Sequence, residues 1–306
     1  MTRKTIIIYI TTLLLLVGCQ ADKTDDPRQD GLVPVTLTAS QGSILSISGG
    51  MTRAADGLYS ATSGFSGGET VRVFLNNSSS YSDYSVGTPS AGVSSLTGGS
   101  LYYPPSGSIN LFAVYPAASA SSHTVAYNQS SDDNYKASDL MYAQKTVAQA
   151  DKAAAQNLEF AHQLVKLKLN INKGAGITSV TEVKMKNVKR TVSVAPTTSS
   201  AGVGSAESST DGHGDEILIF SGSNTSSETQ TYACVFPAQA WNNTDFITVT
   251  ADEKTVTYQL NRSEWTAGAE YELTFHLNAV GQAVQNMNLM FGIDEHAGLR
   301  LKASAF

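Results

Sequence analysis

Charged residues are scarce in this chain of 306 residues, at 15% of the total. Globular chains average about 25%. The shortage disfavours a protein built of long helices or coiled coils. The charges that are present, 20 basic against 26 acidic, give a net charge of −6 and form no basic block. Nucleic-acid binding needs clustered Lys and Arg that displace counterions, so DNA and RNA are excluded as partners.

Cysteine is nearly absent, because Cys19 and Cys234 are the only two in the chain. If Cys19 carries a lipid, as argued below, no disulfide can form within the chain. Cys234 lies between apolar neighbours in a segment with strand composition. This setting predicts a small buried side chain and not a reactive thiolate.

Catalytic and metal-binding motifs are also lacking. The five histidines have no paired-ligand spacing, and there is no phosphate-binding loop or dinucleotide fingerprint. Residues 64–68 match the Gly-x-Ser-x-Gly pattern of a nucleophile elbow, but a strand pattern follows where that motif needs a helix. The polar clusters at residues 132–134 and 213–216 lack the layout of a calcium loop and are expected to be solvated loops. We expect no catalytic residue, no metal ligand and no cofactor, although glycosidase carboxylates are not excluded, because their separation is set in space.

The first residues have the features of an export signal. Arg3 and Lys4 precede an apolar run at residues 5–17, which is shorter than the roughly 20 residues of a membrane-spanning helix. The run ends in Leu16-Val17-Gly18-Cys19, which resembles the lipobox of bacterial lipoproteins. We therefore expect cleavage before Cys19 and attachment of lipid to its thiol.

This reading divides the start of the chain into two parts. Residues 1–18 are the predicted signal peptide, and the polar, acidic residues 19–32 are a predicted disordered tether. Acidic residues just after the lipidated cysteine resemble the surface-export signal of Bacteroidetes lipoproteins. A solvated linker has the same composition, so both interpretations stay open.

From residue 33 onward, apolar and polar residues alternate in short runs separated by Gly, Ser, Asn and Pro. This pattern predicts antiparallel strands joined by turns. Residues 163–171 alternate most regularly and predict a half-solvated strand. Residues 109–115 are apolar on both faces and predict a buried strand. Residues 76–100, rich in Ser, Gly and Asn, are expected to be exposed hairpin loops.

The strand spacing, without helical patterns between the strands, favours β-sandwiches. Only residues 146–157 have helical composition, and we expect a linker or a short helix there. We place an N-terminal sandwich at residues 33–156 and a C-terminal sandwich at residues 157–278. Residues 279–306 are then either a last strand of the chain's own fold or a strand lent to a neighbour. The predicted fold class is all-β.

Several segments together resemble the fimbrillin family of Bacteroidales, whose members are the subunits of surface pili, also termed type V pilins. Their order and spacing match over residues 52–278. The segments are the lipobox at Cys19, Thr52-Arg53-Ala54, Gly68-Glu69-Thr-Val-Arg-Val-Phe74, Tyr102-Tyr103-Pro104, Leu111-Phe-Ala-Val-Tyr115-Pro116, Ser138-Asp-Leu-Met-Tyr-Ala143, Phe160-Ala-His162-Gln-Leu164-Val-Lys166-Leu167 and Trp265-Thr-Ala-Gly268-Ala-Glu-Tyr271. The resemblance implies two tandem transthyretin-like antiparallel β-sandwich domains.

The resemblance also implies a function. Family subunits are non-enzymatic parts of a pilus, or fimbria, or are adhesins, and they are made as lipoprotein precursors on the outer membrane and the cell surface. An arginine-specific protease removes the N-terminal segment, a groove opens, and a strand of the next subunit fills it by donor-strand exchange. The implied partners are other pilus subunits, outer-membrane lipid at Cys19, the protease, and an unidentified ligand on a host or bacterial surface.

Transferred to this chain, the cleaved bond is Arg53-Ala54, in a glycine-flanked stretch that suits a protease. Arg28 in the tether is a competing site, where a cut would free the lipid and keep the first strands. A chain that is never cut is the third possibility, because minor and anchor subunits of such pili can stay whole.

The candidate donor strand lies in residues 279–306, where apolar residues alternate at period two. Leu299 and Leu301 form a second short run nearby. Many family members place a tryptophan near this end and this chain does not. The main candidates are Met287, Leu289, Phe291 and Ile293.

The alternative function is a surface glycan-binding lipoprotein of a polysaccharide-uptake system. Such a protein would also be lipidated, acidic and built of β-sandwiches. It would need exposed aromatic side chains that stack on sugar rings. The available aromatics are Tyr81, Tyr84, Tyr102, Tyr103 and Trp241.

Overall fold

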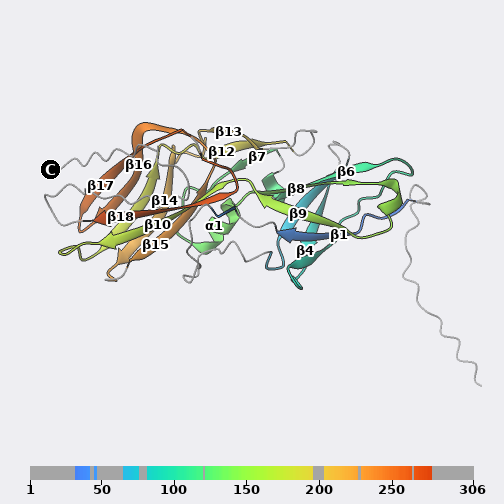
Figure 1. Ribbon diagram of the computed structural model, residues 1–306, viewed down its shortest axis with the longest axis horizontal. Helices are drawn as coiled ribbons and strands as arrows, with labels where there is room; N and C mark the ends of the chain where they lie inside the picture. Colours follow the sequence, from blue (N-terminus) through green and yellow to red (C-terminus); the bar gives the residue numbers. More distant parts are fainter. Residues whose placement is uncertain are drawn as a thin grey trace, which may run out of the picture. The chain divides into compact units, whose positions relative to one another are not determined.

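The computed structural model describes the chain in eight ranges, and its described elements are mainly strands, as predicted (Figure 1). The chain divides into two units, Met1–Leu32 and Val33–Phe306, and all described elements belong to the second. The described residues are 32–41, 45–46, 65–75, 81–119, 121–195, 203–226, 229–263 and 265–277.

Seven strands hydrogen bond in a closed barrel, in the order β1-β5-β4-β3-β6-β8-β9. The barrel closes because β1 pairs antiparallel with β5 and parallel with β9. A closed ring of strands was not expected from the sequence, which predicted a sandwich there. The seven strands are β1 (Leu37–Gln41), β3 (Thr70–Leu75), β4 (Tyr81–Val86), β5 (Val93–Thr97), β6 (Ile109–Tyr115), β8 (Met141–Val147) and β9 (Gln156–His162).

The barrel core explains two of the sequence predictions. Strand β6 lies between β3 and β8, and Leu111 through Val114 are all buried, as expected for a strand that is apolar on both faces. Residues 76–100 were wrongly expected to be loops, since they contain β4 and β5. In these strands Tyr84, Val86 and Leu96 point inward and small polar residues alternate with them. One apolar residue in two is enough for a strand with one solvated face.

The rest of the chain forms three sheets, ordered β15-β10-β18-β2, β14-β11-β16-β17 and β13-β12-β7. Side chains from the two four-stranded sheets share one hydrophobic core. The strands are β2 (Leu45–Ser46), β7 (Ser122–Thr124), β10 (Val165–Lys173), β11 (Val180–Lys186), β12 (Thr191–Val194), β13 (Val203–Glu207), β14 (Glu216–Asn224), β15 (Gln230–Phe236), β16 (Trp241–Ala251), β17 (Lys254–Arg262) and β18 (Ala269–Leu277). The all-β prediction is confirmed, whereas the tandem transthyretin-like arrangement and the domain limits stay predictions.

An aromatic cluster lies at the centre of this second core. Trp241 is 1% exposed and packs edge-on against Phe236 and Phe246, with ring centroids 5.5 and 5.0 Å apart. Trp265 packs against the same rings. The indole N–H of Trp241 donates to the carbonyl of Lys186 at 3.0 Å, so its polar atom is satisfied within the core.

Helices are short, and one of them was not predicted. Residues 132–134 begin α1 (Asp132–Ser138), where a solvated loop was expected. The Ser131 side chain accepts a hydrogen bond from the Asn134 N–H, and two aspartates follow it in the first turn. Both features favour a helix start. Residues 146–157 hold the end of β8, the 3-10 turn η2 (Gln149–Asp151) and the start of β9; the other 3-10 turn is η1 (Ala117–Ser119).

A buried cation organises the loop that contains residues 213–216. Arg190 has no exposed surface; its Nη1 donates to the Val125 carbonyl at 2.9 Å and its Nη2 pairs with Asp211. The His213 ring stacks on Tyr127, 4.4 Å between centroids. Asp211, just before this polar cluster, thus neutralises a buried guanidinium, and the Gly214 carbonyl accepts from its Nε. The hydrogen bond from Arg190 holds the pKa of Asp211 below its ordinary value of 3.8.

The Arg190–Asp211 pair predicts an acid-sensitive contribution to stability. Because the pKa of Asp211 is lower in the folded chain than in the unfolded one, its contribution is complete at neutral pH. It is lost as pH falls from about 4 through the folded pKa. We expect Asp211→Asn to lower the urea midpoint near neutral pH, since a buried cation loses its anion. The gap to the parent should narrow steadily as pH falls below about 4.

Urea unfolding followed by circular dichroism at a series of pH values measures this effect. Glu207→Gln, which removes an exposed charge on β13, is the matched control and should follow the parent at every pH. A gap between Asp211→Asn and the parent that is equally wide at both ends of the series would contradict the prediction.

Candidate assembly site

Strand β1 lies in the barrel between β5 and β9, and neither of these strands adjoins it in the sequence. It pairs in register with β5 from Leu37↔Leu96 to Ser40↔Val93, and with β9 from Leu37↔Gln156 to Gln41↔Phe160. We call this position between β5 and β9 the β1 slot. Without β1, both flanking strands would present unpaired backbone N–H and C=O groups.

The side chains of β1 fit the slot on two faces. Leu37 and Ala39 are 2% and 1% exposed and belong to the barrel core, as does Val35 just before the strand. On the outer face, Thr38 donates to the Oδ1 of Asn157 at 3.1 Å, and the Ser40 hydroxyl accepts from its Nδ2 at 2.9 Å. The slot therefore accepts apolar side chains inward, with room for only a small one at Ala39.

The end of β1 contacts a buried polar pair. The side-chain nitrogen of Gln41 lies 3.2 Å from Nε2 of His162 and 2.8 Å from the sulfur of Met141. On its other side, Nδ1 of His162 lies 2.8 and 3.0 Å from the two carboxylate oxygens of Asp139. A carboxylate at Nδ1 fixes the proton there, so a neutral ring accepts the Gln41 amide proton at Nε2.

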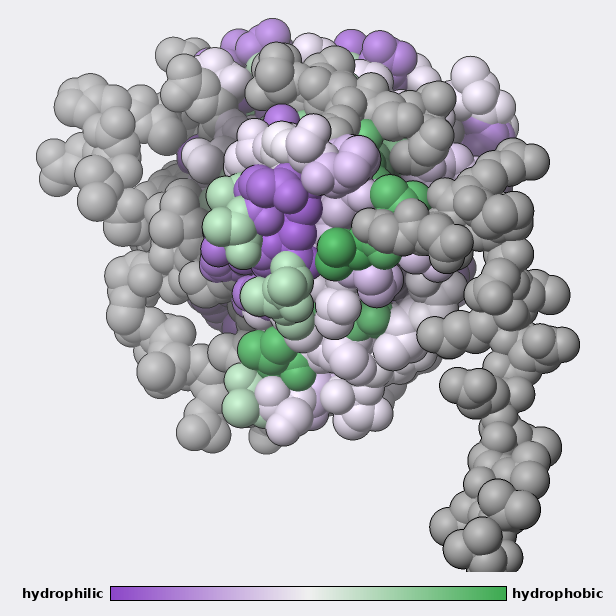
Figure 2. All heavy atoms as spheres, turned by 90° about the vertical axis from the view of Figure 1, so that its right-hand side faces the viewer, coloured by the Kyte–Doolittle hydropathy of each residue, from purple (hydrophilic) through white to green (hydrophobic). Residues whose placement is uncertain are grey.

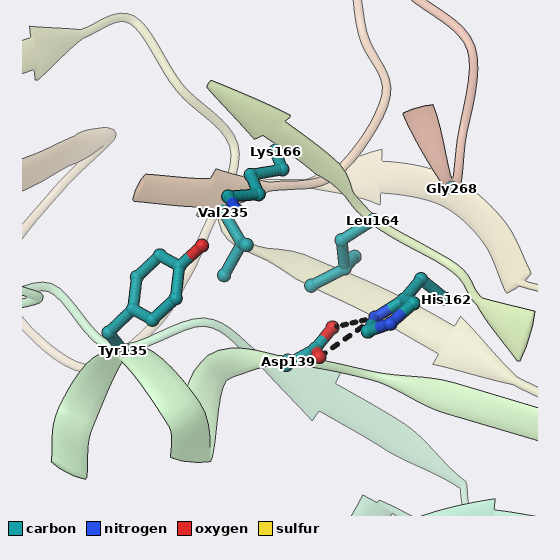
Figure 3. Close-up of a pocket in the computed structure, with 7 residues that line it drawn as sticks. All are labelled: Tyr135, Asp139, His162, Leu164, Lys166, Val235 and Gly268. Carbon is teal, nitrogen blue, oxygen red and sulfur yellow. Dashed lines mark hydrogen bonds and ion pairs between the residues drawn. The ribbon is translucent and has the colours of Figure 1, made fainter. Parts of the chain in front are cut away.

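The His162–Asp139 pair lies beside a small cavity between α1, β9, β10, β15 and the turn before β18 (Figure 3). Both side chains of the pair are about 95% buried, with exposures of 5% and 4%. Figure 3 shows them pointing toward one another. The cavity volume is about 10 Å³, which suits one water molecule and no organic ligand. Its lining residues are Tyr135, Asp139, His162, Leu164, Lys166, Val235 and Gly268.

Gly268 allows the backbone to pass close to this pair. Its φ is +74°, and a Cβ there would lie 2.7 Å from the carbonyl oxygen of His162. Its N–H donates to the Leu164 carbonyl at 2.9 Å. Three of the segments that resemble the fimbrillin family, those with Asp139, His162 and Gly268, therefore meet at one place, which sequence separation alone did not indicate.

The predicted site residues fall outside the described part of the chain. Lipidation at Cys19 and cleavage at Arg53-Ala54 stay predictions, as does the role of the candidate donor strand. Gln41 and the pairing of His162 with Asp139 were not predicted from the sequence. His162 and Asp139 lie in segments that resemble the fimbrillin family, but no local pattern connects residues so far apart.

The surroundings of Ser66 and Cys234, the two candidate nucleophiles, indicate structural roles. Ser66 donates its hydroxyl to the Glu69 carboxylate at 2.6 Å in a glycine-rich turn, not to a histidine. Burial would raise the pKa of Glu69, but hydrogen bonds from Ser66 and Gly67 outweigh it and lower that pKa. Complete burial raises the pKa of the Cys234 thiol. A protonated, enclosed thiol is a packing group.

The aromatics available for sugar binding are mostly inside the fold. Tyr84, Tyr103 and Trp241 are 2%, 1% and 1% exposed. Tyr81 is 50% exposed, but the Arg72 guanidinium lies 3.9 Å above its ring and pairs with Asp83. Figure 2 shows the face turned toward the right of Figure 1, where the coloured residues mix hydrophilic and hydrophobic side chains without a broad apolar area.

The described residues contain neither a candidate metal site nor a helix that could cross a membrane. No group of three or more His, Cys, Asp or Glu side chains in that part could hold a metal ion. Within the same ranges, no helix combines the length and the apolar character that a membrane crossing needs.

Gly268→Ala should destabilise the fold more than an alanine at another left-handed glycine. The positive φ costs about 1–2 kcal/mol, and the contact with the His162 carbonyl adds about 1–3 kcal/mol. Gly107→Ala is the matched control, with φ +83° and open space around its Cβ. Urea unfolding of both variants measures the difference. Equal losses would contradict the assigned contact.

Comparison with solved structures identifies proteins of similar fold. A Bacteroides uniformis protein assigned to cell adhesion aligns with a TM-score of 0.56 and 17% identity, covering 80% of this chain and 93% of that one. A second such protein, from Bacteroides ovatus, has a TM-score of 0.55 and 16% identity, covering 79% and 92%. A third, from Bacteroides fragilis, has a TM-score of 0.53 and 12% identity, covering 86% and 99%. At these identities the likeness is one of fold.

Comparison by sequence gives a family. A search of curated proteins found no match. The model of the fimbrillin-like family matches residues 52–289, which include most of the barrel, all of the second core and all three segments that meet at the His162–Asp139 pair. The chain therefore belongs to the fimbrillin-like family.

Proposed function

We propose that this chain is a non-enzymatic pilus subunit or adhesin of the cell surface, assembled by exchange of the strand in the β1 slot. It is made as a precursor anchored in the outer membrane through lipid on Cys19. An arginine-specific protease cuts at Arg53-Ala54, and the subunit then joins a fimbrium through other subunits. Membership of the fimbrillin-like family supports the general role, and the β1 slot supports the route of assembly.

The main support for this proposal is the way in which β1 is held. It pairs with a strand on each side, and its covalent link to the next barrel strand, β3, runs through residues 42–69, which contain Arg53. A cut after Arg53 leaves β1 attached by non-covalent contacts. The contacts that then hold this piece are two short backbone ladders of β1, a few buried side chains, the Gln41 contact to His162 and the pairing of β2 with β18. A strand this short is held far more weakly when it is no longer part of the same chain, because its effective concentration falls from the millimolar range.

Loss of β1 would create a specific binding surface. Two strand edges would be open, and barrel core residues that Leu37 and Ala39 now cover would face water. An extended segment from another subunit would restore the ladders and refill the inward positions. The first candidate is the alternating segment with Met287, Leu289, Phe291 and Ile293.

The alternative of sugar binding has less support in the described residues. Three of its five aromatics are in cores, and Arg72 stacks on one face of the half-exposed Tyr81 ring. The cavity beside His162 is too small for a sugar ring.

Cleavage after Arg53 should convert a monomer into SDS-resistant oligomers. The test uses the chain with Cys19→Ser, purified whole and treated with an arginine-specific protease, then analysed by gel filtration, SDS gels without heating and N-terminal sequencing. The expected product begins at Ala54 and forms a ladder. The slot is blocked before the cut and open after it.

Two variants control this experiment. Arg53→Ala should stay monomeric under the same treatment, and Arg28→Ala should polymerise like the parent. If the product that begins at Ala54 stays monomeric at high concentration, the proposed route of assembly is wrong.

A further inference from the structure

The two ends of β1 are held in different ways. At its start, the Val35 N–H donates to the Leu101 carbonyl at 2.9 Å. On the other edge, the Thr36 carbonyl accepts from the Gln156 N–H at the same distance. Among the described residues, pairing with β5 stops before Gln41, which pairs with β9 alone. A strand end paired on one edge frays more readily than one paired on both, so the opening of β1 should begin at Gln41.

The side chain of Gln41 supplies a contact at this end. Its register partner on β9 is Phe160, and His162 lies two residues further along the same face of that strand. The amide nitrogen of Gln41 therefore reaches Nε2 of His162, 3.2 Å away. A neutral ring with its proton on Nδ1 accepts this amide proton. The last paired residue of β1 is thus held by a side-chain hydrogen bond.

The acceptor, His162, is fixed by residues that belong to no barrel strand. The two carboxylate oxygens of Asp139, which follows α1, lie 2.8 and 3.0 Å from Nδ1. The turn at Gly268 packs against the His162 carbonyl oxygen. Just before Asp139, the Ser138 carbonyl accepts from Nε2 of His123 on β7 at 2.8 Å, so the end of α1 is itself anchored. The position of the acceptor therefore depends on α1 and β7 as well as on the barrel.

We propose that Gln41, His162 and Asp139 form a latch that closes the end of β1 and sets how often this strand opens in the whole chain. Gln41 is the part that moves with β1, His162 is the acceptor, and Asp139 is a positioning residue that acts through the ring. The side chains of His162 and Asp139 are 5% and 4% exposed, so water competes little for the bond.

The latch acts before any cut, and it does not rest on strand exchange. In the assembly proposed above, it would delay the departure of β1. It also connects β1 to α1, because a displacement of Asp139 would move the acceptor away from Gln41.

The latch predicts a local effect on hydrogen exchange. Loss of one neutral hydrogen bond changes an opening equilibrium about fivefold, and the change should be confined to the residues that leave together with Gln41. A general loss of stability would instead speed exchange in every strand, through global unfolding. Native-state hydrogen exchange resolved by residue separates these two cases.

Two substitutions at His162 form a matched pair. The chain carries Cys19→Ser and is kept whole. His162→Asn keeps an amide near the position of Nδ1 but is too short to reach Gln41, whereas His162→Gln places an acceptor near the position of Nε2. We expect exchange at residues 39–41 to be about fivefold faster than in the parent with His162→Asn, and close to the parent with His162→Gln. Strands β6 and β10 are the internal reference and should keep the rates of the parent.

Variants at the other two positions test their separate roles. Gln41→Met keeps the length of the side chain but has no N–H, so exchange at residues 39–41 should be about fivefold faster. Asp139→Ala should speed exchange there in the parent and add little in the Gln41→Met background, because Asp139 acts through that contact. Asp133→Ala makes the same change at an exposed position of α1 and should leave β1 unaffected.

Four results would overturn the inference. The first is exchange in Gln41→Met that equals the parent at residues 39–41, and the second is His162→Gln exchanging as fast as His162→Asn. The third is equal acceleration by Asp139→Ala in both backgrounds, which would remove its action through Gln41. The fourth is acceleration of β6 and β10 by the same factor as β1, which would assign the effect to overall stability. Because the chain is never cut, these results are independent of whether strand exchange occurs.

Discussion

The pairing of β1 on both of its edges is the constraint on which the barrel depends. Every other strand of the ring pairs with at least one strand that lies close to it in the sequence. The pairing of β1 with β9 is the parallel one in the ring. It joins residues that are 119 positions apart in the sequence, such as Thr38 and Asn157. The ring is therefore closed by a strand of five residues whose two partners come from distant parts of the sequence.

The junction around His162 connects this strand to the rest of the fold. Gln41 contacts the ring, Asp139 fixes its tautomer, and Gly268 lets the turn before β18 approach its carbonyl oxygen. The cavity beside it has room for one water molecule and not for a substrate. These residues pack three distant segments of the fold together, and all three segments lie within the part of the chain that matches the fimbrillin-like family.

Local sequence pattern was sufficient where burial is one-sided and regular. The patterns of residues 163–171 and 109–115 predicted β10 and β6. Alternation of apolar and polar residues indicates a strand buried on one face, and a continuous apolar run indicates one buried on both. Strands β4 and β5 were missed because their outward positions include Ser and Asp, which are also common in turns. Helix α1 was missed although Ser131 and two aspartates are a helix-start signal. The parallel β1–β9 pairing and the Gln41–His162 contact could not be predicted, because no local pattern encodes the partner of a distant residue.

Strand β2 extends the same stretch to a second sheet. Leu45 and Ser46 pair with Ala269 and Glu270 at the start of β18, a few residues after β1 leaves the barrel. One short piece of chain thus shields the edges of two sheets. An unshielded edge can recruit any extended polypeptide, so a subunit that has lost this piece is vulnerable to misassociation. In the assembly proposed above, trimming would therefore have to be coupled closely to capture by the next subunit.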